Sequence, residues 1–120
     1  MNSNISLRLP SDSKYILPLR LFIAGVAIRM DFPAETVEDI KMANAEAGSI
    51  LINGAKEGSE LFVEVFQEGR NMIVELSVDS FNDNVAVDDI SSAILSAMSD
   101  ECELIYRNGT CSKIRIKFEN

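Results

Sequence analysis

Residues 37–53 constrain the fold more than any other part of the chain, because they read as one long amphipathic helix. At about 100° per residue, the apolar side chains of this stretch fall on one broad face. The residues of that face are Val37, Ile40, Ala43, Ala47, Ile50, Leu51 and Gly54. An acidic residue, Glu46, lies at the margin of the face. The pattern predicts a helix that packs on a hydrophobic core and holds one carboxylate at the edge of that core.

Two other apolar stripes predict further helices, one on either side of the first in the sequence. The earlier stripe follows a possible cap at Ser11–Ser13, and Pro18 should lie in the first turn of its helix or kink it. The later stripe has apolar residues at i, i+3, i+4, i+7 and i+8 from Ile90, and Asp88 or Asp89 can cap it. The expected helices cover residues 14–30, 33–55 and 88–99.

The remaining segments alternate apolar and polar residues and predict strands. A first strand ends at Pro10, and two hairpins follow with turns at Gly69-Arg70 and Asn108-Gly109. The first hairpin places Glu64 opposite Glu75, an unfavourable pair that a basic residue from a neighbouring strand or a second subunit would neutralise. The candidates for that role are Lys113 and Arg115. The second hairpin is expected to bury Ile105, Ile114, Ile116 and Phe118.

The order strand, helix, helix, strand, strand, helix, strand, strand predicts an α+β two-layer sandwich in a single domain, residues 1–120. Five strands and three helices favour a mixed, mostly antiparallel sheet with all helices on one face. The other face would then expose Phe62, Phe66 and Ile73. An uncovered apolar patch of this kind indicates an interface. We therefore expect a partner surface or a homodimer there.

Charge and composition exclude several classes of function. The 120 residues carry a formal net charge of −8, which disfavours binding to the phosphate backbone of nucleic acids. The most apolar stretch, residues 15–30, is broken by Pro18, Arg20, Gly25 and Arg29, so no membrane span is expected. No basic segment with a following apolar run and cleavage site opens the sequence, which favours a cytoplasmic protein.

The two cysteines are expected to be free thiols. In the hairpin centred on Asn108-Gly109, Tyr106 would face Cys111 and Cys102 would face Arg115. The sulfurs would then lie about 13 Å apart at strand spacing, beyond the reach of a disulfide. The sequence contains no histidine that would complete a catalytic or metal-binding pair with either thiol.

Several segments in this order resemble the anti-sigma-factor serine kinases, which belong to the GHKL ATPase superfamily. The resemblance lies in Gly25-Val26-Ala27-Ile28-Arg29-Met30, in Glu38-Asp39-Ile40-Lys41-Met42-Ala43 leading to Glu46-Ala47, and in Asp100-Glu101. In that family the long helix reads Glu-Ala-x-x-Asn. The resemblance implies that Glu46 matches the residue that polarises the attacking hydroxyl or water.

The chain departs from the family at each part of the nucleotide site, as a degenerate member would. Ile50 stands where the family has its magnesium-binding Asn, and an aliphatic side chain cannot coordinate a cation that requires oxygen ligands. Asn53 is a poor substitute, about 4.5 Å further along the helix axis. Asp79 is the nearest match to the adenine-binding Asp, but no glycine follows it before Gly109.

The glycine-rich lid of the family is also missing. Asp88-Asp89 stands in its place, and the connector from Asp79 to Asp88 is too short for a flexible lid. Two carboxylates would repel phosphate where the family offers free backbone amides. We therefore expect no bound cofactor, no metal and negligible binding of magnesium-ATP, and Glu46 would be a vestige of the catalytic residue.

The resemblance implies a regulatory protein that acts by contact with other proteins, a sigma factor or an anti-sigma antagonist. Arg20 and Arg29 of the first helix are then candidate contacts, together with the Phe62, Phe66 and Ile73 patch. An alternative is an active ATP-dependent serine kinase that phosphorylates an antagonist protein through an altered metal site. A third is a scaffold whose ancestral pocket binds another small molecule or nothing.

Overall fold

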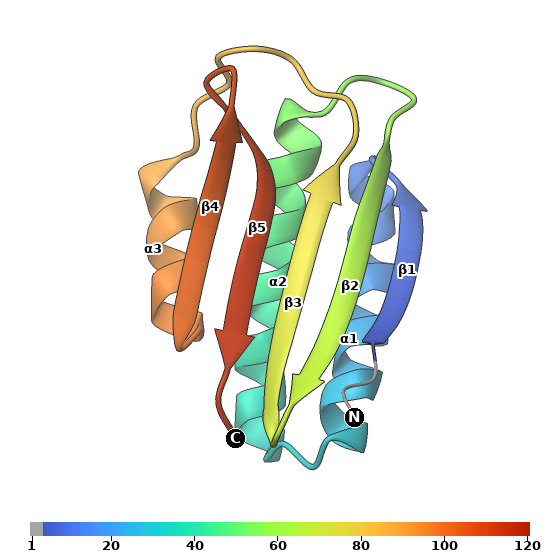
Figure 1. The fold of residues 1–120 in the computed structure, drawn as a ribbon, viewed down its shortest axis with the longest axis vertical. Helices are drawn as coiled ribbons and strands as arrows, with labels where there is room; N and C mark the ends of the chain where they lie inside the picture. Colours follow the sequence, from blue (N-terminus) through green and yellow to red (C-terminus); the bar gives the residue numbers. More distant parts are fainter. Residues whose placement is uncertain (1–3) are drawn as a thin grey trace.

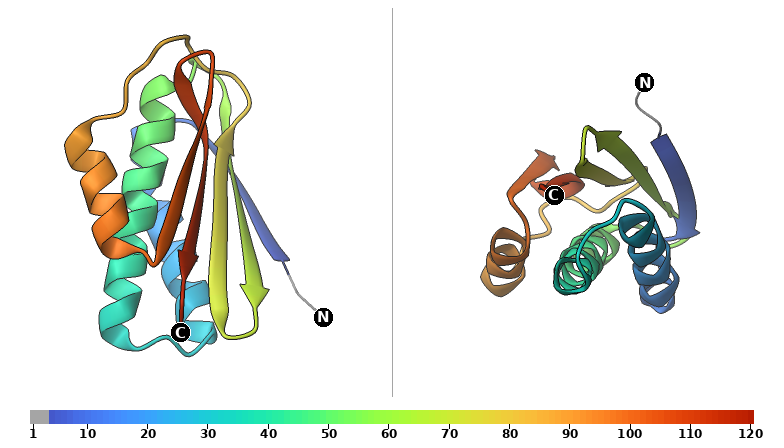
Figure 2. Two further views of the ribbon diagram at one scale, coloured as in Figure 1. Left: turned by 60° about the vertical axis from the view of Figure 1, so that its left-hand side comes forward. Right: turned by 90° about the horizontal axis from the view of Figure 1, so that it is seen from below.

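A computed structural model describes residues 4–120 as a five-stranded sheet with three helices on one face (Figures 1 and 2). This arrangement confirms the predicted α+β class with the helices on a single side. The elements in chain order are β1 (Asn4–Pro10), the 3₁₀ turn η1 (Ser13–Tyr15), α1 (Ile16–Arg29), α2 (Ala34–Gly54), β2 (Glu60–Glu68), β3 (Asn71–Val78), α3 (Asp89–Met98), β4 (Glu101–Arg107) and β5 (Thr110–Phe118).

The strands are ordered β1-β2-β3-β5-β4, and every neighbouring pair is antiparallel. The prediction of a mixed sheet is therefore wrong for the described residues. The reason lies in the crossover through α3, which makes β4 run parallel to β3. Strand β5 then inserts between these two, so the parallel strands are not neighbours. Strands β1 and β4 form the two edges of the sheet (Figure 1).

Capping residues and prolines set the first residues of α1 and α2. The first begins at Ile16, later than residue 14, because Asp12 accepts a hydrogen bond from the Lys14 amide at 3.1 Å and starts the short 3₁₀ turn instead. Pro18 lies in the first turn of α1, where its missing N–H costs nothing. The central helix, α2, begins directly after Pro33 and packs against α1, α3 and the sheet.

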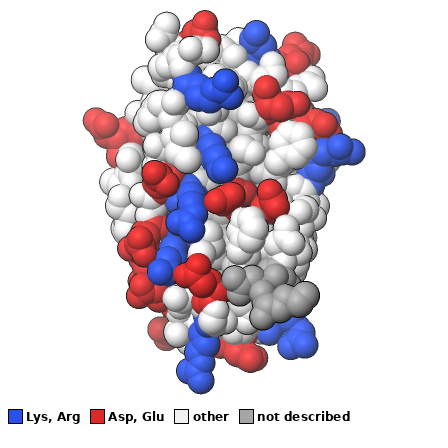
Figure 3. All heavy atoms as spheres, viewed as in Figure 1, with Lys and Arg blue, Asp and Glu red and all other residues white. Residues whose placement is uncertain are grey.

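The first hairpin has the predicted register. Glu64 lies opposite Glu75, and Phe66 lies opposite Ile73. Glu75 forms ion pairs with Lys113 at 3.5 Å and Arg115 at 3.3 Å, so the neighbouring strand β5 supplies the neutralising charge. Basic and acidic side chains are interspersed over this outer face of the sheet (Figure 3).

The second hairpin differs from the prediction by one residue. A bulge between Ile105 and Tyr106 shifts the register, so Cys102 lies opposite Ile116, and Leu104 opposite Ile114. Leu104 therefore packs on the core, and Ile105, expected in the core, is paired with Lys113 on the outer side. A bulge adds one residue to one strand and reverses the facing of those beyond it. Both cysteines are free, as predicted.

The outer apolar patch is smaller than predicted. Ile73 is only 4% exposed, and Phe62 and Phe66 are half-buried. Ile73 lies between Phe66 and Lys117 on adjacent strands, and such cross-strand neighbours cover one another on a sheet surface. The expectation that Ile73 lies exposed is therefore wrong, and of the three predicted residues only Phe62 and Phe66 present apolar surface there.

Candidate functional site

A small cleft lies between α2 and α3. This cleft, the position that the family resemblance gives to a nucleotide, has a volume of about 340 Å³ and is lined by Ser49, Ile50, Asn53, Ala86, Val87, Asp88 and Ser91. Ile50 is half-buried in its wall, so an aliphatic side chain occupies the position that the family resemblance gives to a magnesium ligand. Asn53, one turn further, is exposed at the rim. Glu46 is half-buried one turn before Ile50 and is not part of the lining.

The helix N-terminus beside this cleft already has an anionic ligand. The Asp88 carboxylate accepts a hydrogen bond from the Ile90 amide at 2.7 Å, and Asp89 occupies the first turn of α3. A free helix N-terminus binds phosphate because its amides are unpaired and its dipole is positive. Here the Asp88 side chain is hydrogen-bonded to one of these amides, and the negative charges of Asp88 and Asp89 repel an incoming phosphate.

The connector between β3 and α3 is held by hydrogen bonds to neighbouring elements and does not form a flexible lid. The Asn82 amide donates to the Gly54 carbonyl at 2.8 Å, and the Asn84 amide donates to the Asn108 carbonyl at 2.9 Å. The Thr110 hydroxyl accepts from the Val85 amide at 3.0 Å and donates to the Asn82 carbonyl at 2.5 Å. The connector is thereby held against both the end of α2 and the β4–β5 hairpin (Figure 1).

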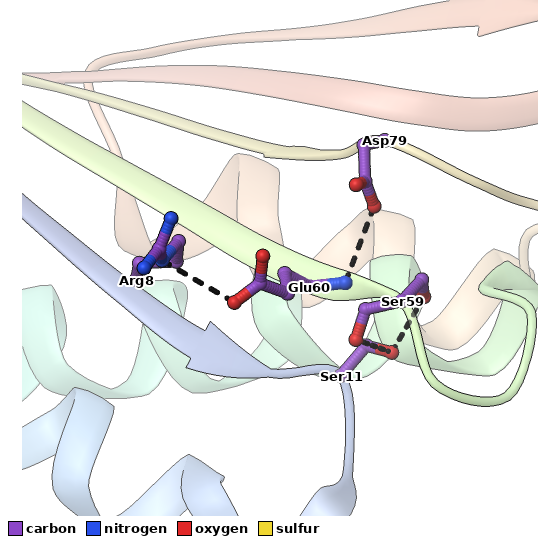
Figure 4. A network of polar contacts seen from close by, with 5 residues as sticks. All are labelled: Arg8, Ser11, Ser59, Glu60 and Asp79. Atoms are coloured by element: carbon purple, nitrogen blue, oxygen red, sulfur yellow. Dashed lines mark hydrogen bonds and ion pairs between the residues drawn. The ribbon is translucent and has the colours of Figure 1, made fainter.

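Asp79 holds two strands together at this end of the sheet. Its carboxylate accepts a hydrogen bond from the Glu60 amide at 3.2 Å, where β2 begins (Figure 4). The same network contains an ion pair between Arg8 and Glu60 at 3.3 Å, and the Ser11 and Ser59 hydroxyls lie 2.6 Å apart. Asp79 is not among the residues that line the α2–α3 cleft.

The two arginines predicted as partner contacts both lie exposed on α1. Neither has an acidic partner within 4.0 Å in the described residues. Arg29 also lines a groove of about 980 Å³ between α1 and strands β1 and β2. The sequence pattern did not predict this groove. The sequence feature that points to it is the apolar character of α1 on every side. A helix on the surface of a monomeric protein normally has one polar face.

No group of three or more His, Cys, Asp or Glu residues is placed to hold a metal ion within residues 4–120. Over the same residues, no helix has the length and apolar character needed to cross a bilayer.

Burial raises the pKa of the Cys102 and Cys111 thiols. For Cys111, hydrogen bonds to the backbone oppose this effect without reversing it, and its Sγ lies 3.5 Å from the Lys113 carbonyl oxygen. We expect Cys111, 2% exposed, to react with iodoacetamide at pH 8 at least about tenfold more slowly than in urea. Half-buried Cys102 should react at an intermediate rate. Equal native and denatured rates at Cys111 would contradict this burial.

The raised thiol pKa values also predict how stability depends on pH. Their contribution to stability is full below the unfolded thiol pKa, about 8.5, because both states are then protonated. It decreases as the pH rises towards the folded values, because the unfolded chain releases its protons first. Urea unfolding of the wild type and Cys111→Ala at pH 7 and pH 10 measures this: the decrease should be smaller in the variant.

The comparisons with known proteins agree with the resemblance over part of the chain. The chain is 37% identical over 60 residues to the serine-protein kinases RsbW of Listeria monocytogenes and Listeria innocua, which covers 50% of this chain and 38% of each relative. It is 38% identical over 56 residues to RsbW of Oceanobacillus iheyensis, which covers 47% of this chain and 35% of the relative. The chain thus matches well under half the length of these curated relatives. No protein-family model matches it.

Proposed function

We propose that this protein is a regulatory binding module with the GHKL fold of the anti-sigma-factor kinases, that it acts by protein–protein contact, and that it does not use ATP. The α+β fold and the similarity to serine-protein kinases over half the chain support the kinship. The observation that carries the loss of ATP is the α2–α3 cleft. In this cleft, Ile50 stands where the family has its metal ligand, and the Asp88 carboxylate accepts a hydrogen bond from the Ile90 amide at the start of α3. Thr110 also holds the connector between β3 and α3 in place.

The partner that we propose is a sigma factor or an anti-sigma antagonist protein in the cytoplasm. Support comes from the exposed arginines Arg20 and Arg29 on α1, which have no acidic partner among residues 4–120, and from the similarity to the RsbW kinases. Glu46 then remains as a structural carboxylate at the edge of the core, and Asn53 and Asp79 have no ligand role.

The experiment that tests this proposal is recovery of the partner from native cells. Cells producing the tagged chain are treated with a short crosslinker, and the captured proteins are identified by mass. The purified partner is then titrated with wild type and with Arg20→Glu, and Arg107→Glu serves as an exposed control on the distant hairpin. We expect a specific partner and at least about tenfold weaker binding by Arg20→Glu only. Equal binding by all three proteins would contradict the role of α1.

A second candidate function, an ATP-dependent serine kinase, is favoured by Glu46 and by the similarity to serine-protein kinases. It requires another group to hold magnesium. Asn53 is exposed at the rim of the cleft, and Asp88 is bound to the Ile90 amide. Phosphate transfer to a captured partner distinguishes this candidate from the first.

We also propose a homodimer that forms through the outer sheet face or the free edge of β1. A two-fold interface needs only one self-complementary patch, and Phe62 and Phe66 present apolar surface beside the charged residues of this face. Sedimentation at tens of micromolar should give a dimer for the wild type and a monomer for Phe62→Asp/Phe66→Asp. A monomeric wild type would contradict the dimer.

A further inference from the structure

The outer surface of α1 is an unpartnered apolar stripe. Leu17, Leu21 and Ile28 are 61%, 63% and 63% exposed, although each is a large aliphatic residue. With Ala24 they follow a spacing of four, three and four residues, which is the a/d pattern of a helix that packs along another helix. Three of the seven exposed large hydrophobic residues in residues 4–120 therefore lie on one line of one helix.

Gly25 lies beside this stripe and has no explanation within the fold. Glycine in a helix interior lowers stability by about 0.5–1 kcal/mol relative to alanine, so it normally has a packing reason. A Cβ atom added to Gly25 would have no atom of the described part of the chain, residues 4–120, among its surroundings within 4 Å. The chain itself gains nothing from the missing side chain. A glycine here permits close approach by another molecule.

The stripe borders the groove between α1 and strands β1 and β2. Apolar residues of both layers form its walls, among them Phe22 and Val26 from α1 and Val65 from β2. Ile5 of β1, 45% exposed, lies on the opposite wall from the helix. The apolar surface continues out of the groove over Leu17 and Ile28, which the groove does not include. A small molecule would leave that continuation in water, whereas a protein segment would cover both.

The charges around this surface favour an acidic occupant. Arg29 and Arg70 both line the groove, with Asp31 as the one acidic side chain of the lining, and neither arginine has an ion-pair partner in the described residues. The sequence of α1, Ile16–Arg29, contains two arginines and no acid. A second copy packed two-fold on this stripe would place α1 on α1 with no acid on either helix. A head-to-tail contact between copies would form a ring or an open filament instead of a two-fold dimer.

We infer that the α1 stripe and the adjoining groove, which we call the α1 groove, bind an acidic amphipathic helix of a different protein. The inference rests on the proposed function and specifies the chemistry of the partner segment. The apolar residues of the partner helix pack along Leu21 and Ile28 with its backbone close to Gly25. Carboxylates on the flanks of that helix pair with Arg29 and Arg70.

A three-heptad peptide with leucine at positions a and d and glutamate at the flanking positions is the probe, labelled for fluorescence anisotropy. The same peptide with lysine in place of glutamate is its control. We expect the wild type to bind the acidic peptide at least about tenfold more tightly than the basic one. Arg29→Glu/Arg70→Glu should reverse this order. Arg107→Glu, an exposed arginine on the β4–β5 hairpin, should leave it unchanged.

Gly25→Gln is the most informative variant, because it separates binding from stability. The glutamine has free space and a better helix propensity, so the melting temperature should rise or stay constant. Affinity for the acidic peptide should nevertheless fall at least about tenfold. Leu21→Ser should weaken binding as well, whereas Ile90→Ser, a 71% exposed position on α3, should not.

Three results would overturn the inference: no binding of the acidic peptide, equal affinity for both peptides, or unchanged affinity in Gly25→Gln. A wild-type dimer that dissociates in Gly25→Gln would also overturn it, because a second copy would then occupy the stripe. The α1 groove and the α2–α3 cleft share no lining residue. A nucleotide titration therefore tests the proposed function independently: ATP binding would contradict that function and leave the peptide result standing.

Discussion

Gly109→Ala is expected to lower the free energy of unfolding by about 2–4 kcal/mol. Gly109 has a φ of 75°, a left-handed conformation that costs alanine about 1–2 kcal/mol. An added Cβ would also collide with the Asn84 side chain and lie 3.2 Å from the Asn84 Cα. The connector would then have to leave the hairpin, with loss of the hydrogen bond from the Asn84 amide to Asn108.

Gly69→Ala is the matched control for this substitution. Gly69 has a φ of 62° in the other hairpin turn, and no atom of the residues that the structure describes lies within 4 Å of its added Cβ. The two variants therefore share the backbone strain and differ in the contact with the connector. Urea unfolding should show Gly69→Ala destabilised by only about 1–2 kcal/mol. Equal losses in the two variants would mean that the connector is not held by the hairpin.

Magnesium-ATP is expected to give no saturable heat in a calorimetric titration up to about 1 mM. A dissociation constant of about 1 mM corresponds to a binding free energy of only about 4 kcal/mol. The reason is the combination of Ile50 in the cleft wall, the Asp88 carboxylate on the Ile90 amide and the fixed connector. Ile50→Asn alone should not restore binding, because it supplies a metal ligand and leaves the anionic helix terminus unchanged.

A dissociation constant in the low micromolar range for the wild type would contradict the proposed loss of ATP. Restoration by Ile50→Asn alone would show that only the metal ligand was lost. The folded state of each variant is checked by its thermal unfolding, since Ile50 is half-buried at the rim of the core.

Local pattern predicted most of the fold. The three helices, the five strands and the β2–β3 register follow from side-chain periodicity and from the Gly69-Arg70 turn, because those signals act over a few residues. The ion pairs of Glu75 with β5 were also foreseen as one of two possibilities. The predictions that failed depend on how segments far apart in the sequence pack together. The bulge at Ile105 leaves no mark in the alternation, and the burial of Ile73 needs neighbours from two other strands.

The candidate site shows the same division. The sequence shows directly that Ile50 stands where the family resemblance implies a metal ligand, and that two acids stand at the start of α3. The role of Thr110 cannot be read from the sequence, because it joins the connector to β5 across 25 residues of chain. The α1 groove also depends on how β1 lies beside α1, and only the exposure of Leu17, Leu21 and Ile28 shows that the apolar residues of α1 exceed what the core uses.

Mixing the chain with its captured partner in the presence and absence of magnesium-ATP tests the central claim most directly. Affinity is measured by titration, and the intact mass of the partner is measured by mass spectrometry after incubation. The proposed function predicts the same affinity in both conditions and an unchanged partner mass. A partner that gains the mass of a phosphoryl group, with loss of that gain in Glu46→Gln, would instead show an active serine kinase.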